Sequence, residues 1–167
     1  GTFVNVGGLS YGYSIGIGNV DFDNAGNELI YLNDAVGWHA TGDNIGTGWH
    51  HVAFTIDGSQ NTTVYLDGVN VLSFTETPNS GTNYSFIGSS SGISRNLTGG
   101  KIDEIRFWNT VLTESEIRQN MYRVLPEPFD GDLVSYYKLN ETSNTGNRID
   151  ATGNNRGLPS QLASDAC

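Results

Sequence analysis

Apolar and polar residues alternate with a period of two along most of this chain of 167 residues. Because successive side chains of a β-strand point to opposite faces, this alternation predicts strands that each turn one face towards a core. Glycine, asparagine and serine separate the alternating runs, and they are typical of turns. The dipeptide Asp67-Gly68 predicts a two-residue hairpin turn, since both central positions of such a turn need positive φ. The predicted strands cover Thr2–Val6, Tyr11–Ile17, Glu28–Asn33, Gly37–Thr41, His50–Asp57, Thr63–Asp67, Asn70–Glu76, Tyr84–Gly88, Lys101–Trp108 and Leu133–Leu139.

The chain has one clear helix signal. Thr113, followed three residues later by Glu116, predicts a helix N-terminus closed by a capping box. Apolar residues continue at helical spacing as far as Val124, and Pro126 ends the run. Strands and helices do not alternate as they would in a parallel α/β fold. We therefore predict an all-β fold, an antiparallel two-sheet β-sandwich (jelly roll) with one short surface helix.

The charge balance excludes several classes of partner. Lys and Arg number 8 against 18 Asp and Glu, which gives a net charge of −10. A nucleic-acid-binding protein needs a basic face for the phosphate backbone, and a membrane-surface protein needs a basic patch. No run approaches the roughly 18 apolar residues of a membrane helix. We expect neither nucleic acid as a partner nor insertion into a membrane.

Cysteine usage and the ends of the sequence say little about compartment. The single cysteine, Cys167, excludes an internal disulfide. The sequence begins at Gly1 and its only methionine is Met121, so we expect a processed product or a piece of a longer protein. Richness in glycine, serine, threonine and asparagine with little lysine is typical of secreted β-proteins. Location outside the cell, secreted or on the cell surface, is therefore the expectation.

Five motifs occur in an order and spacing that resemble one family. They are Trp49–Thr55, Val64–Gly68, Ser85–Gly88, Gly100–Trp108 and Leu112–Ile117. Together they resemble the second half of a laminin-G-like domain, a jelly roll of the concanavalin A-like lectin and glucanase type. The resemblance extends over about residues 10–123. It implies a binding module of a secreted or surface protein.

The C-terminal region departs from that family pattern. Residues 132–141 and 150–157 resemble the opening of such a domain, although here they come last. Either the domain is permuted, or the chain joins the end of one repeat to the start of the next. In this fold the opening and closing strands are neighbours, so we predict that Leu133–Leu139 pairs antiparallel with Lys101–Trp108. The predicted organisation is a jelly-roll body over 1–128 and a segment over 129–167 that completes the sandwich or begins a repeat.

The sequence lacks the residues of a glycosidase of this fold. Retaining enzymes need two carboxyl groups about 5–5.5 Å apart, and the family supplies them from a Glu-x-Asp-x-x-Glu strand that is missing here. The adjacent pair Asp103-Glu104 would point to opposite faces of a strand. A Ser–His–Asp arrangement with a nucleophile elbow is also missing. We predict that the chain is not an enzyme.

A hairpin between two predicted strands carries the candidate sugar-binding residues. Sugar binding needs a flat apolar face with polar groups that orient hydroxyls. Tyr31, Asp34, Trp38 and His39 supply both around one turn. The alternative is that Tyr31 and Trp38 simply cover the sandwich.

Other aromatic and imidazole residues are assigned to structure. Trp49 and Trp108 lie in strand motifs and are expected in the core. His50 and His51 would project to opposite faces of a strand and so would not share a metal ion.

Calcium is the predicted ion. Hard cations prefer carboxylate and carbonyl oxygens, which the acidic, Asn-rich and Gly-rich loops provide. The resemblance implies a rim or convex-face site fed by the Ile102–Glu104 run and by the opening segment, which suggests Asp103, Asn140 and Asp150. The alternative is that Asp103 forms a local salt bridge, Asn140 ends a strand and Asp150 caps a turn.

These observations lead to one functional hypothesis with two alternatives. The hypothesis is a non-catalytic adhesion module of a larger secreted or cell-surface protein, which binds a glycan or a surface protein and has calcium as a candidate stabiliser. Other domains of the parent chain are expected partners. The alternatives are a structural spacer and an accessory part of a carbohydrate-active enzyme.

Overall fold

The computed structural model describes residues 1–7, 12–18, 26–33, 36–79, 85–89, 96–141 and 148–154. Asp34 and Cys167 lie outside these residues, as do the first residues of two predicted strands, Tyr11 and Tyr84. The described elements are β1 (Thr2–Val6), β2 (Tyr13–Gly18), β3 (Glu28–Asn33), β4 (Gly37–Asn44), β5 (Val52–Ile56), β6 (Asn61–Leu66), β7 (Val69–Thr75), β8 (Phe86–Ile87), β9 (Ile105–Trp108), α1 (Glu114–Asn120) and β10 (Leu133–Tyr137).

The chain divides into two compact units. The first contains residues 1–101 and 112–122, and the second contains residues 102–111 and 123–167. The predicted division into 1–128 and 129–167, with its choice between permutation and a new repeat, stays a prediction. Among the described helices, none is long and apolar enough to cross a membrane.

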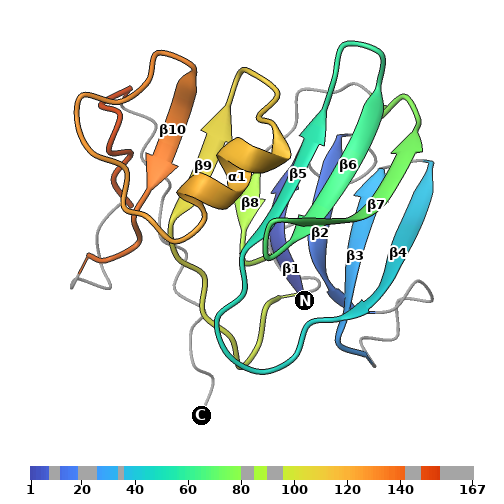
Figure 1. Cartoon of the computed structure of the whole chain (residues 1–167). Helices are drawn as coiled ribbons and strands as arrows, with labels where there is room; N and C mark the ends of the chain where they lie inside the picture. The colour runs from blue at the N-terminus through green and yellow to red at the C-terminus, as the bar shows by residue number, and fades with distance from the viewer. Residues whose placement is uncertain are drawn as a thin grey trace. The chain divides into compact units, whose positions relative to one another are not determined.

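The first unit is built from two antiparallel sheets. One has the strand order β4-β3-β2-β1-β8 and the other β5-β6-β7. Figure 1 shows β5, β6 and β7 as one layer in front of β1 to β4. Buried and half-buried side chains of both sheets form one core, in which the ring of Phe54 lies 5.1 Å from Tyr13 and 5.3 Å from Tyr31. The predicted all-β sandwich with one short helix is confirmed.

The Asp67-Gly68 turn joins β6 to β7 as predicted. Asp67 has φ of 51° and Gly68 has φ of 74°, which is the left-handed backbone that a two-residue hairpin turn requires. A Cβ atom on Gly68 would lie 2.6 Å from Cγ of Arg118. Glycine is therefore needed here both for its backbone and for the close approach of α1.

Helix α1 begins as the sequence predicted. The Thr113 side chain accepts a hydrogen bond from the backbone N–H of Glu116, and the Glu116 carboxylate accepts one from the backbone N–H of Thr113. Ile117 is buried, and Arg118 Nε donates to the Gly68 carbonyl at 2.7 Å. The helix is shorter than the apolar spacing indicated. It ends at Asn120, and Val124, which the spacing included, is 64% exposed.

The second unit contains the late strand. β10 pairs antiparallel with β9, with Tyr137 opposite Ile105 and Tyr136 opposite Arg106. The predicted pairing of these two segments is confirmed. Both strands are shorter than predicted, because Glu104 and Leu139 have positive φ of 55° and 51° and left-handed backbone cannot continue a strand.

Candidate functional site

The predicted sugar-binding hairpin, β3–β4, does not present its residues on one surface. Tyr31 faces His39 across the hairpin, while Trp38 faces Leu32. Because Trp38 and His39 are consecutive on a strand, their side chains point to opposite faces of the sheet. Tyr31 has no exposed surface, and burial raises the pKa of its hydroxyl. Tyr31 thus packs in the core, in agreement with the alternative that it covers the sandwich. Asp34 lies outside the described residues.

His39 belongs to a polar cluster at the rim between the two sheets. Its ring stacks on Phe74 with a centroid distance of 3.9 Å, and its Nε2 lies 2.9 Å from Oε2 of Glu76. The buried Asn33 donates from Nδ2 to the same Glu76 oxygen at 3.3 Å. The His39 and Glu76 side chains are 23% and 29% exposed. The rim cluster of Asn33, His39 and Glu76 therefore holds a partly exposed carboxylate in a fixed position.

A second group of residues surrounds the carboxylate of Asp67. His50 Nδ1 lies 2.9 Å from Asp67 Oδ2, the backbone N–H of His51 donates to Oδ1 at 2.8 Å, and the Tyr122 hydroxyl donates to Oδ1 at 3.4 Å. Burial alone would raise the pKa of Asp67, but these hydrogen bonds and the charge of His50 together outweigh burial, and the pKa lies below its ordinary value. In turn the charge of Asp67 raises the pKa of Tyr122.

The expectation that Trp49 lies in the core is wrong. Its side chain is 64% exposed. It lies in the exposed loop 46–49, and β5 begins three residues later at Val52. Tyr122, just after α1, is 69% exposed. We call Trp49, His50, Asp67, Arg118 and Tyr122 together the Asp67 surface. Trp108 is half-buried in β9.

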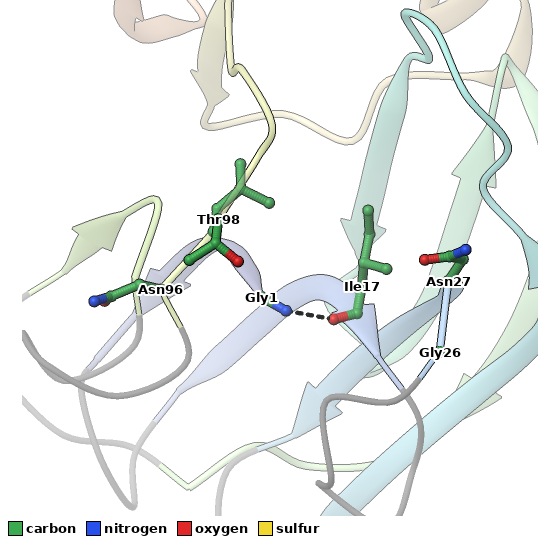
Figure 2. A pocket seen from close by; sticks show the side chains of 7 residues that line it. Gly1, Ile17, Gly26, Asn27, Asn96 and Thr98 are labelled. Atoms are coloured by element: carbon green, nitrogen blue, oxygen red, sulfur yellow. Dashed lines mark hydrogen bonds between the residues drawn. The ribbon is translucent and has the colours of Figure 1, made fainter.

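A polar pocket of about 400 Å³ lies at the end of the five-stranded sheet (Figure 2). Along the wall of the pocket, the Gly1 nitrogen donates a hydrogen bond to the carbonyl of Ile17 at 2.6 Å. The pocket is lined by Gly1, Ile17, Gly26, Asn27, Asn96, Leu97 and Thr98. These residues offer amide and hydroxyl groups but no aromatic ring. The pocket therefore suits a small polar group and provides no face on which a sugar ring could stack.

The predicted metal ligands lie in the second unit, where two of them already have structural partners. The exposed Asp103 accepts a hydrogen bond from the backbone N–H of Glu104 at 2.9 Å. Asp150 is 5% exposed, and its Oδ1 accepts from the backbone N–H of Tyr136 and from the N–H and hydroxyl of Thr152. Burial raises the pKa of Asp150, but these hydrogen bonds outweigh it and the net pKa is lowered. Asn140 is exposed.

The chemistry of these three side chains suits calcium, because two carboxylates and an amide oxygen are hard ligands. In the described part of the chain, however, His, Cys, Asp and Glu do not gather in any group of three or more that could hold a metal ion. The calcium site stays a prediction.

A polar network that the sequence did not indicate joins β9 to β10. Arg106 Nη2 donates to Oε2 of Glu104 at 2.8 Å, and the hydroxyl of the fully buried Tyr136 donates to the same oxygen. The Arg106 guanidinium lies 5.1 Å from the centre of the Tyr136 ring, and Phe129 meets that ring edge-on. Burial, followed by the hydrogen bond to Glu104, raises the pKa of Tyr136. These contacts fix the pairing of the two strands.

Comparison with known families agrees with this two-sheet architecture. The family model described as the concanavalin A-like lectin/glucanases superfamily matches residues 3–118. The chain belongs to this superfamily. The laminin-G-like, concanavalin A-like resemblance seen in the motifs is thereby confirmed. Among curated proteins, none matches the sequence.

One solved structure similar to this chain comes from Bacteroides ovatus and is described as a "putative carbohydrate binding protein". The two chains share 26% sequence identity and superpose with a TM-score of 0.68. The match covers 91% of this chain and 45% of the other, so the chain spans less than half the length of that structure.

Proposed function

We propose that this chain is a non-catalytic carbohydrate-binding module of a larger secreted or cell-surface protein. Membership of the superfamily supports this proposal, as does the similarity to a structure described as carbohydrate-binding. The missing Glu-x-Asp-x-x-Glu pattern favours binding over hydrolysis. Adhesion to a glycan-bearing surface is the role that such a module would serve.

The observation that carries the proposal is the rim cluster. Glu76 presents a partly exposed carboxylate that His39 and Asn33 hold in place. A carboxylate fixed in this way accepts hydrogen bonds from sugar hydroxyls without the entropic cost of ordering it first. Trp38, half-buried on the other face of the hairpin, offers apolar surface but cannot contact the same sugar ring as His39.

Retention on a glycan array tests the proposal. We expect the wild-type chain to be retained on a subset of glycans and Glu76→Gln to be retained about tenfold less, because a charge-assisted hydrogen bond is lost. Glu127→Gln, which removes an exposed carboxylate elsewhere, should bind like the wild type. Trp38→Ala measures the contribution of the other face. A chain that no glycan retains would be a spacer, and the proposal would be wrong.

Calcium stabilisation is a separate part of the proposal. If Asp103, Asn140 and Asp150 contribute to a calcium site, a chelator should lower the thermal midpoint and added calcium should restore it. Asp103→Asn should remove this response. An unchanged midpoint in the presence of the chelator would remove calcium from the proposal.

A further inference from the structure

We propose that the Asp67 surface is a binding site for a neutral sugar ring, which would stack on the exposed rings of Trp49 and Tyr122. This inference rests on the proposed carbohydrate-binding function. It adds a site distinct from the rim cluster and names the class of ligand.

The two aromatic rings are exposed in a way that the fold alone does not require. Trp49 is 64% exposed and Tyr122 is 69% exposed. Burial of an aromatic side chain normally stabilises a protein, since the hydrophobic effect contributes about 25 cal/mol per Å² of apolar surface. Single exposed apolar residues are common on protein surfaces. Here one exposed ring, Tyr122, is hydrogen-bonded to Asp67, and the other, Trp49, precedes in sequence two residues that are hydrogen-bonded to it. Two such rings can supply the apolar face that a sugar ring needs.

The carboxylate of Asp67 connects the segments that carry both rings. The Tyr122 hydroxyl donates a hydrogen bond to Oδ1 of Asp67 at 3.4 Å. His50, the residue next to Trp49, is hydrogen-bonded through Nδ1 to Oδ2 of Asp67 at 2.9 Å, and the backbone N–H of His51 donates a hydrogen bond to Oδ1 of Asp67. Trp49 is thus the sequence neighbour of His50, whose side chain is hydrogen-bonded to Asp67. Residues 50–51 and residue 122, which are distant in sequence, thus meet at one turn, and Trp49 directly precedes the first of these segments.

The turn that carries Asp67 is itself held firmly. Arg118 Nε donates to the carbonyl of Gly68 at 2.7 Å, and Arg118 also forms an ion pair with Glu114 at 2.5 Å. The first of these bonds attaches α1 to the β6–β7 hairpin, and Tyr122 lies two residues beyond the end of that helix. A surface that is already ordered loses little conformational entropy when a ligand binds.

The same surface carries polar groups that can orient sugar hydroxyls. The Asp67 side chain is 37% exposed. It accepts three hydrogen bonds from described residues, from His50, His51 and Tyr122, and a carboxylate can accept about four. The Tyr122 hydroxyl can accept a hydrogen bond as well as donate one. Flat apolar rings beside hydroxyl-binding groups are the combination that recognises a sugar.

The charges of this surface select a neutral ligand. Asp67 and Glu114 are both acidic, and the ion pair with Glu114 engages Arg118. The net charge of the whole chain is −10. A uronic acid or a sulfated sugar would meet like charge at the site and would be repelled over roughly 8–10 Å at physiological salt. A neutral pyranose pays no such cost.

Titration with oligosaccharides tests this inference. The probes are neutral oligosaccharides of glucose, xylose and galactose, with polygalacturonate and chondroitin sulfate as acidic counterparts. We expect the wild type to bind a neutral probe, and Trp49→Ala and Tyr122→Ala to bind it about tenfold more weakly or worse, because aromatic residues dominate such contacts. Trp49→Phe keeps a ring and should retain most of the affinity.

The controls separate loss of the ring from loss of the fold. Ile149→Ala removes an apolar side chain of nearly equal exposure, 65%, and should leave binding unchanged. Because the Trp49 side chain is exposed, Trp49→Ala should keep the thermal midpoint of the wild type. Quenching of tryptophan fluorescence by acrylamide should fall when the neutral probe is bound, and this protection should be missing in Trp49→Phe.

Each other outcome overturns the inference in a recognisable way. Binding of a neutral glycan that neither Trp49→Ala nor Tyr122→Ala weakens would exclude this surface but leave the proposed function intact. Preferred binding of the acidic probes through Trp49 would overturn the ligand class. A Trp49→Ala effect on self-association alone, seen by sedimentation, would make the surface a protein interface. Failure of the wild type to bind any glycan would overturn the proposed function as well.

Discussion

Asp150 illustrates how one buried carboxylate joins β10 to the short segment around residues 150–152. Its Oδ1 accepts hydrogen bonds from the backbone of β10 and from Thr152, and its Oδ2 is buried. These bonds outweigh the cost of burial and hold the pKa of Asp150 below its ordinary value of 3.8. The folded state therefore favours the charged form. The stability that this provides is fully present above the ordinary pKa and is lost as the pH falls through the lower pKa of the folded protein.

Asp150→Asn tests that argument. We expect a loss of about 1–3 kcal/mol at pH 7, because a neutral amide oxygen is a weaker acceptor than the carboxylate for the donors at Oδ1, and the amide –NH₂ would be buried at the place of Oδ2. The difference between variant and wild type should shrink as the pH falls through the lowered pKa of the folded protein, because the wild-type carboxyl then becomes protonated. Denaturant unfolding at several pH values measures it. Asp132→Asn, at an exposed carboxylate, should change stability little, and an Asp150→Asn difference that is independent of pH would contradict the linkage.

At the scale of elements, the β6–β7 hairpin is fixed by its turn and by the helix that packs on it. Gly68→Ala should destabilise the protein because it places a Cβ at φ of 74° and within 2.6 Å of Arg118. Gly99 has nearly the same φ, 75°, but no atom within 4 Å of the equivalent Cβ. Gly99→Ala therefore measures the backbone strain alone, about 1 kcal/mol.

The comparison of these two variants isolates the packing of α1. We expect Gly68→Ala to lower the free energy of unfolding by about 1–3 kcal/mol more than Gly99→Ala, since overpacking adds to the strain. Thermal or denaturant unfolding gives both values. Equal losses would show that Arg118 moves away at no cost, and that α1 is not tightly packed on the turn.

Sequence patterns predicted strands and the helix start well wherever the whole pattern lies within one strand or one helix. The strands Thr2–Val6 and Glu28–Asn33 have the predicted bounds, and the capping box at Thr113 is present. Strand ends were harder to predict. Glu104 and Leu139 adopt left-handed backbone that their residue types do not signal, so β9 and β10 begin or end inside the predicted runs. Tertiary contacts, rather than local preference, decide such positions.

At the scale of the molecule, the fold was predictable but the surfaces were not. The ordered motifs indicated the superfamily, and neighbouring ends of that fold indicated the β9–β10 pairing. The rim cluster joins His39 to Glu76 across 37 residues, and Asp67 meets Tyr122 across 55. Nothing local to any of these residues predicts its partner. The exposure of Trp49 was likewise hidden, because its motif continues directly into a strand.

The late segment leaves two whole-molecule organisations open, and truncation after residue 128 separates them. The truncated chain lacks β10, so β9 loses its hydrogen-bonded neighbour. We expect the amide hydrogens of Ile105–Trp108 to exchange at least about tenfold faster than in the full chain. Hydrogen exchange followed by mass spectrometry measures this, and protection that persists in these amides would mean that β10 does not stabilise β9.

The amides of β6, Asn61–Leu66, decide between the two organisations. In a permuted single domain, β10 completes a shared core, so β6 should lose protection together with β9. If the late segment starts a separate repeat, the two core sheets of the first unit should stay intact and β6 should keep its protection. We predict joint loss, because β10 pairs with β9, and β9 lies in the sequence between two segments of the first unit, residues 1–101 and 112–122.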